Sequence, residues 1–141
     1  MTRFRCVPCF TACVAVAVAL LLVGNVQAQK TRGKTRPATT KQLMKGIVAP
    51  TCGELKKLLE EKEPNWENVS TKAAVLNEAG YLLLDDGRCP DGDWAKASES
   101  LKSHSAAILE AAGKKDAGAA NEAFKKLTSD GCAACHKVHK N

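Results

Sequence analysis

The sequence predicts an all-α fold, an antiparallel bundle of four helices. From residue 39 onward, apolar residues recur at steps of three and four in four successive stretches, which is the spacing of one helical face. Short segments rich in Gly, Pro and Asp separate these stretches, and little of the sequence alternates as a strand would. Because the connections are short, consecutive helices are expected to be antiparallel neighbours.

The first helix is expected to begin at Thr39 or Thr40, either of which can cap it, and to end before Pro64. Its apolar positions are Leu43, Met44, Ile47, Val48, Leu55, Leu58 and Leu59. Pro50 lies inside this pattern and lacks a backbone N–H, so a kink or a short break is expected there.

The other three helices follow from their boundary signals. Asn65 is a cap for the second, and the segment "DDGRCPDGD" at 85–93 ends it. The third helix carries Trp94 near its start and Gly113 as its C-terminal stop. The fourth opens at Asp116 and continues to the end of the chain.

The predicted core is poor in large side chains. After residue 28 the only aromatic residues are Trp66, Tyr81, Trp94 and Phe124, and alanine fills much of the inward face. A bundle of about 100 residues buries little apolar area by itself. Either closely packed alanine helices suffice, or a large apolar cofactor supplies the missing volume.

Residues 1–28 are predicted to be a signal peptide. Arg3 and Arg5 precede an apolar run at 10–23, and small residues allow cleavage before Gln29. The alternative is an uncleaved membrane anchor. In either case the positive residues keep the N-terminus inside, so the rest of the chain is expected to be exported to the periplasm.

Residues 29–38, "QKTRGKTRPA", are predicted to be a basic flexible linker, because they lack apolar periodicity. The segment from residue 39 to 141, predicted as the folded domain, carries 15 basic and 15 acidic residues, so the high pI belongs to the linker. Nucleic acid is therefore not an expected partner. The linker either keeps the chain soluble or contacts anionic lipid or an acidic partner.

Cysteines carry the strongest chemical signal. Cys132-Ala-Ala-Cys135-His136 is the attachment pattern of a c-type haem. On a helix the two thiols share a face and can add to both vinyl groups, while His136 approaches the iron as axial ligand. A thiol–disulfide redox centre would normally open a helix after a strand, and a zinc site would need a second ligand pair. One covalent haem c is the expected cofactor.

Spacing alone does not identify the residue opposite His136. Met44 is the one methionine after residue 28, and it is either the distal iron ligand or a space-filling core residue. His139 follows His136 by three residues on the same helix face, so it cannot reach the far side of the same iron. His104 is expected to be a packed or surface histidine.

Residues 39–141 resemble the class II cytochromes c, the cytochrome c′ family. The resemblance rests on "KQLMKGI" in the first helix, on Trp94 after a Gly/Pro-rich loop, and on "FKKLTSDGCAACH" in the last helix. It implies a one-electron carrier rather than an enzyme, with Met44 as distal ligand in the six-coordinate branch. The other branch is five-coordinate and binds NO or CO, which is the alternative function. Redox proteins are the expected partners, together with a homodimer, since many relatives pair.

Two departures from the family pattern bear on the site. The family often has Arg where this chain has Lys140, which with Lys137 and His139 forms either a basic docking rim or a solvated helix end. The second departure is the pair Cys52 and Cys89, in the first helix and in the loop between the second and third. In an oxidising compartment we expect these two to form a disulfide, the alternative being two separately buried thiols.

Overall fold

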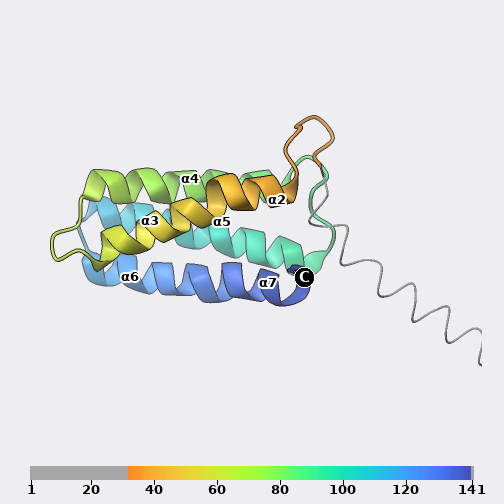
Figure 1. The fold of residues 1–141 in the computed structure, drawn as a ribbon. Coiled ribbons are helices and arrows are strands. Elements are labelled where there is room, and N and C mark those ends of the chain that lie inside the picture. Colours follow the sequence, from red (N-terminus) through yellow and green to blue (C-terminus); the bar gives the residue numbers. More distant parts are fainter. Residues whose placement is uncertain (1–31, 141) are drawn as a thin grey trace, which may run out of the picture.

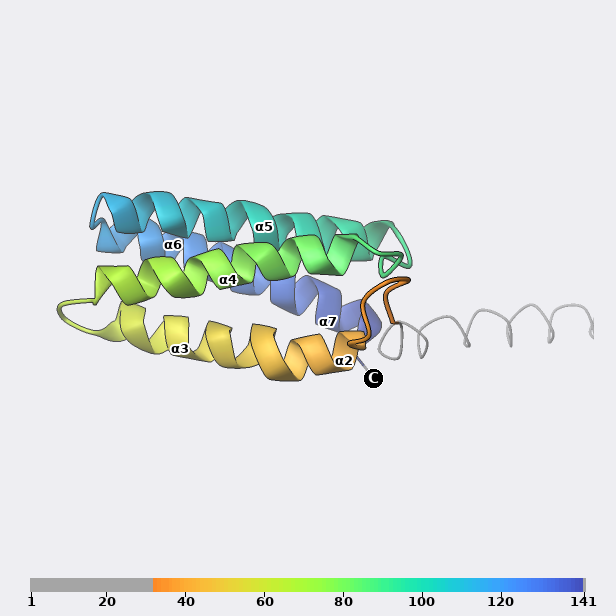
Figure 2. The same ribbon diagram turned by 90° about the horizontal axis from the view of Figure 1, so that it is seen from above.

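The computed structural model describes residues 32–140, which form four antiparallel rods (Figures 1 and 2). In chain order, the elements are α2 (Thr40–Leu43), the π-helical segment η1 (Met44–Val48), α3 (Ala49–Glu60), α4 (Trp66–Leu84), α5 (Gly92–Gly113), α6 (Ala117–Lys126), the π-helical segment η2 (Leu127–Ala133) and α7 (Ala134–His139). We call the four helical segments rods: the first runs from α2 to α3, the second is α4, the third is α5, and the fourth runs from α6 to α7. The all-α class is confirmed for residues 32–140; the predicted signal peptide lies outside them.

Side-chain caps start the rods where the sequence predicted them. Thr39 Oγ1 accepts a hydrogen bond from the N–H of Gln42 at 3.2 Å, and Gln42 Oε1 accepts one from the N–H of Thr39 at 2.8 Å. Asn65 and Asp116 each accept from the N–H three residues on, at 3.1 and 3.0 Å. These bonds satisfy amides that the first helical turn leaves without partners.

The chain stays helical through Pro50, so there is no break, but the hydrogen-bond pattern changes just before the proline. The preceding segment η1 is π-helical, and the N–H of Ala49 bonds to the carbonyl of Met44. Pro50 then falls in the first turn of α3, where a missing N–H costs little. The wider π-helical turn therefore accommodates Pro50 without interrupting the helix. α5 ends at Gly113, as predicted, although the left-handed residue that follows is Lys115, with φ 55°.

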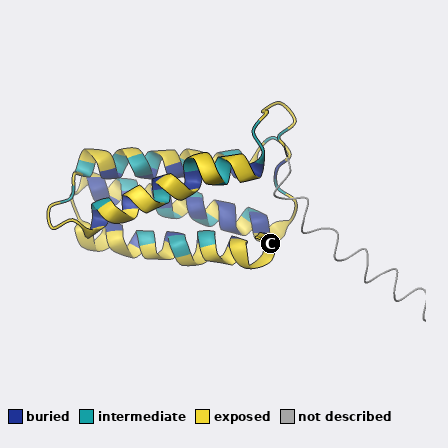
Figure 3. Ribbon diagram, in the orientation of Figure 1, coloured by how far each residue is buried: buried dark blue, intermediate teal, exposed yellow. Residues whose placement is uncertain are grey.

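The helices α4 and α5 pack extensively against each other, whereas α3 and α6 scarcely contact. Much of the α5 ribbon is coloured as buried in Figure 3. Val69, Ala73, Leu76 and Ile108 are fully buried. Trp94 is 2% exposed, and its indole N–H donates to the carbonyl of Leu83 at 2.7 Å. Within residues 32–140, no helix is both long and apolar enough to cross a membrane.

Residues 34–38, part of the predicted flexible linker, are held to the α4–α5 loop by polar contacts that we call the Asp86 clasp. The Asp86 carboxylate accepts from the amides of Thr35 and Arg36 at 2.8 and 3.0 Å. The buried Arg88 guanidinium donates to the carbonyls of Ala38 at 2.7 Å and Arg36 at 3.3 Å. The clasp fixes where the first rod begins, at the end of the bundle that also holds the C-terminus (Figure 1).

Candidate functional site

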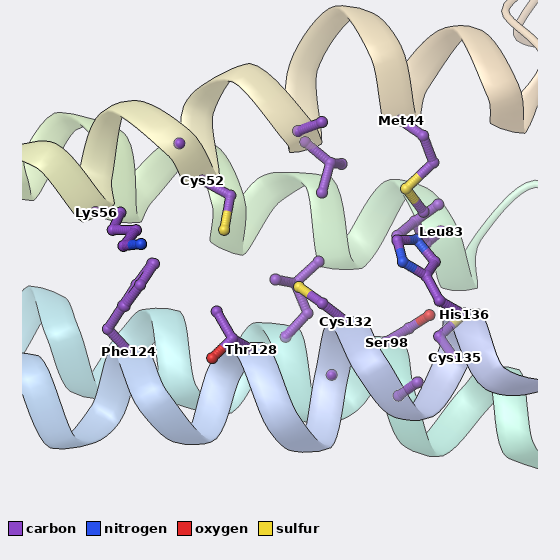
Figure 4. Close-up of a pocket in the computed structure, with 16 residues that line it drawn as sticks. Met44, Cys52, Lys56, Leu83, Ser98, Phe124, Thr128, Cys132, Cys135 and His136 are labelled. Atoms are coloured by element: carbon purple, nitrogen blue, oxygen red, sulfur yellow. The ribbon is translucent and has the colours of Figure 1, made fainter. Parts of the chain in front are cut away.

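A largely apolar cavity of about 480 Å³ lies between the first and fourth rods, with α5 contributing part of its wall (Figure 4). Each rod contributes a stripe in which every fourth residue lines the cavity. The first rod contributes Met44, Val48, Cys52 and Lys56, and the fourth contributes Phe124, Thr128, Cys132 and His136. The volume falls in the range of about 300–1,000 Å³ typical of small-molecule sites.

Small residues set the width of this cavity. A Cβ built on Gly53, which lines the first rod's side, would meet no atom within 4 Å. On the other side, a Cβ on Gly131 would lie 3.4 Å from the backbone N of Leu101, so η2 packs directly on α5. The fourth rod is therefore seated against α5, while the first rod stands away from it and leaves the space open.

Both π-helical segments carry predicted site residues. Met44 is the first residue of η1, and Cys132 lies within η2. The residue that follows each segment makes the wider π-helical hydrogen bond, to a carbonyl five residues back. The N–H of Ala49 donates to the carbonyl of Met44, and the N–H of Ala134 donates to that of Ser129. Short π-helical turns inside α-helices occur frequently at functional sites. Here they flank the same cavity.

Met44 and His136 extend toward each other from the two rods (Figure 4). Partial burial, and then the positive charge of Lys140, lower the pKa of His136. The imidazole is therefore held neutral near pH 7, which is the form that coordinates a metal. A thioether and a neutral imidazole that face each other can supply two axial ligands to one iron.

The two thiols of the attachment motif also line this cavity. Cys132 is half-buried, and Cys135 is buried at the start of α7. Burial, and then the negative charge of Asp91, raise the pKa of Cys135 to about 11. The motif's cysteines and its histidine are thus brought to the same cavity as Met44, which the sequence placed on a different helix.

The predicted disulfide between Cys52 and Cys89 is not formed: both are free thiols. Cys89 lies in the loop that ends the bundle, where its thiol donates to the carbonyl of Asp91 at 3.3 Å. Cys52 lies farther along the first rod, and its sulfur faces that of Cys132 across the cavity (Figure 4). Sequence reasoning missed this cavity residue, although the four-residue steps from Met44 to Val48 to Cys52 carried the signal.

The two remaining histidines lie outside the cavity lining. His139 is 4% exposed, with its ring edge-on to Trp94 at 5.3 Å between centroids and its Nε2 3.4 Å from Asp91 Oδ1. It therefore fastens α7 to the start of α5 and is not part of a solvated helix end. His104 lies 3.8 Å from a carboxylate oxygen of Asp130, as a partly exposed surface histidine.

Among residues 32–140, no group of three or more His, Cys, Asp or Glu side chains is arranged to hold a metal ion. A haem iron makes no such demand, because the porphyrin supplies its equatorial ligands. Protein-family models, curated proteins and solved structures were compared with this chain, and none of them matches it.

Proposed function

We propose that this chain is an exported monohaem c-type cytochrome that carries single electrons between redox partners. The observation that carries the proposal is one cavity that collects Met44, His136 and the thiols of Cys132 and Cys135. These four side chains come from opposite rods, and each has a distinct part in binding one haem.

The residues present fit a haem in chemistry and in size. Cys132 and Cys135 would hold the macrocycle through thioethers, and His136 and Met44 would be the axial ligands. Apolar residues of the cavity, such as Val48 and Phe124, would cover the ring and keep water away. When bound, haem c supplies an iron that accepts and releases one electron, and His/Met ligation raises its potential.

Export remains part of the proposal, because haem c attachment takes place outside the cytoplasm. The surface near the cavity carries Lys45, Lys137 and Lys140, which are exposed. An acidic redox partner would be steered toward such a surface, with a dependence on ionic strength.

The direct test is the purified mature chain, examined by intact mass and by absorption in both redox states. We expect the mass of one haem on a chain that begins at Gln29, sharp α and β bands after reduction, and no rapid change with CO. Met44→Leu keeps the apolar volume but removes the thioether, so it should become high-spin and bind CO. Lys45→Ala, at the neighbouring exposed position, is the control and should keep the wild-type spectrum.

Two results would overturn the proposal in different ways. A chain that carries no haem after export would exclude a cytochrome altogether. A wild-type spectrum that is already high-spin and shifts at once with CO would exclude Met44 as ligand and favour the gas-binding alternative.

A further inference from the structure

The cavity contains a third thiol that the haem attachment motif does not use. Cys52 projects from α3, two four-residue steps beyond Met44, and its sulfur faces that of Cys132 on η2 (Figure 4). The two thiols are close enough that the Cys132 side chain is the largest influence on the pKa of Cys52. Because Cys52 is only half-buried and lines an open cavity, small reagents can reach it.

We propose that Cys52 and Cys132 form a disulfide in the chain before haem is attached. The bond would join the first rod to the fourth across the cavity. Its formation does not depend on haem. Its consequence rests on the proposed function: an oxidised Cys132 has no thiol to add to a vinyl group, so attachment would require prior reduction.

The neighbours of each sulfur favour this pairing over the alternatives. Cys89 lies in the loop at the end of the bundle, where its thiol is bonded to the carbonyl of Asp91, and it does not line the cavity. Cys135 is buried, so a small oxidant reaches it less easily than it reaches the half-buried Cys52. The neighbouring Cys132 side chain lowers the pKa of Cys52 to about 7, despite partial burial, so Cys52 is the better nucleophile.

The oxidant that we infer is a small-molecule disulfide such as oxidised glutathione. The Cys52 thiolate attacks one sulfur of the oxidant, forms a mixed disulfide and releases one thiolate. The Cys132 sulfur then loses its proton, attacks the Cys52 sulfur and displaces the second thiolate. The two cysteines lose two electrons and two protons, and the oxidant becomes two thiols.

The test is a peptide map of the haem-free full chain after oxidised glutathione, with remaining thiols blocked by N-ethylmaleimide. Trypsin separates the relevant cysteines, since Cys52 falls in residues 46–56, Cys89 in 89–96 and Cys132 in 127–137. We expect 46–56 linked to 127–137 in the wild type and in the Cys135→Ser variant, which excludes Cys135 as the partner. Cys89→Ser is the matched control and should keep the link, whereas Cys52→Ser should lose it.

The inference is overturned if 46–56 is linked to 89–96, or if Cys52 is fully blocked while 127–137 holds only an internal bond. The wild-type map decides this even if a variant fails to fold. Haem attachment is measured separately, in cells that attach haem. There, wild type without reductant should carry at least several-fold less haem than Cys52→Ser. Equal haem content in wild type and Cys52→Ser would show that the disulfide does not compete with haem attachment. No haem in either protein would overturn the proposed function but not the disulfide.

Discussion

The α4–α5 interface and the space between the first and fourth rods are two opposite ways of pairing helices in one bundle. α4 and α5 pack in contact over most of their length, and Gly80 lets their backbones approach: a Cβ there would lie 3.2 Å from the carbonyl oxygen of Ser98. Across the bundle, α3 and α6 scarcely touch, and a Cβ on Gly53 would meet open space. Glycine is needed for the close approach at the first interface, whereas the space beside Gly53 would stay open with a larger residue.

This difference separates the part of the molecule that stabilises the fold from the part that is available for a ligand. The buried side chains of α4 and α5 have no room to move, as in any close-packed interior. The cavity side chains lack neighbours on one side and so lose packing contacts. Stability of the haem-free chain should therefore depend on the α4–α5 half, and a ligand should stabilise the other half.

The largest expected effect comes from the fully buried Leu76 of α4. Leu76→Ala should lower the free energy of unfolding by about 2–5 kcal/mol, through lost burial and a new cavity. Phe124→Ala is the matched truncation in the cavity and should cost only about 1–2 kcal/mol in the haem-free chain, because its ring is half-buried. Urea unfolding followed by circular dichroism measures both.

The difference between these two losses of unfolding free energy should become smaller once haem is attached, because the porphyrin ring would then pack against Phe124. An equal loss at both positions in the haem-free chain would mean that the cavity is closed in solution. That result would contradict the contrast between the two halves.

The local signals in the sequence account for most of the fold. The sequence predicted Thr39 or Thr40 and Asn65 as caps and Asp116 as the start of the fourth helix, and Thr39, Asn65 and Asp116 each accept an amide hydrogen bond. A cap depends on residues within one turn, so no knowledge of the rest of the fold is needed. The spacing of Cys132, Cys135 and His136 is equally local.

What the sequence could not supply was the rotation of one rod relative to another. Whether Cys52 faces Cys132 depends on the π-helical turns of η1 and η2, which shift the faces of both rods. The pairing with Cys89 was predicted from the compartment alone. The Asp86 clasp was also missed, because bonds from backbone amides to one carboxylate leave no periodic pattern in the sequence.

The next largest expected effect concerns the closely packed α4–α5 interface. Gly80→Val should lower the free energy of unfolding by about 1–3 kcal/mol, because its added carbons must displace Lys102 and crowd the backbone of α5. Gly53→Ala, the counterpart on the cavity wall, should raise it by about 0.5–1 kcal/mol, since alanine is the better helix former and meets no neighbour. Thermal unfolding of the two haem-free variants shows whether each substitution raises or lowers the stability. A loss at Gly53 would show that the first rod packs closer to its neighbours than the structure has it.

The smallest effect concerns the Asp86 clasp, which ties the start of the first rod to the closed half. Desolvation would raise the pKa of Asp86, but hydrogen bonds from Thr35 and Arg36, together with the charge of Arg88, outweigh it and lower the pKa below 3.8. A lowered pKa means that the carboxylate stabilises the clasp above pH 3.8 and that this contribution is lost as the pH falls through the folded-state value.

The amide resonances of Thr35 and Arg36 should therefore shift together in an NMR titration below pH 3.8, before the resonances of Val69 and Ala73 in α4 change. Asp85→Asn should leave this titration in place, because the side chain of Asp85 takes no part in the clasp, and Asp86→Asn should abolish it. If α4 responded at the same pH as residues 34–38, the clasp and the α4–α5 interface would be one cooperative unit. The first rod would then be as firmly held as the rest, and the cavity would be a rigid site whose two walls do not move apart to admit a ligand.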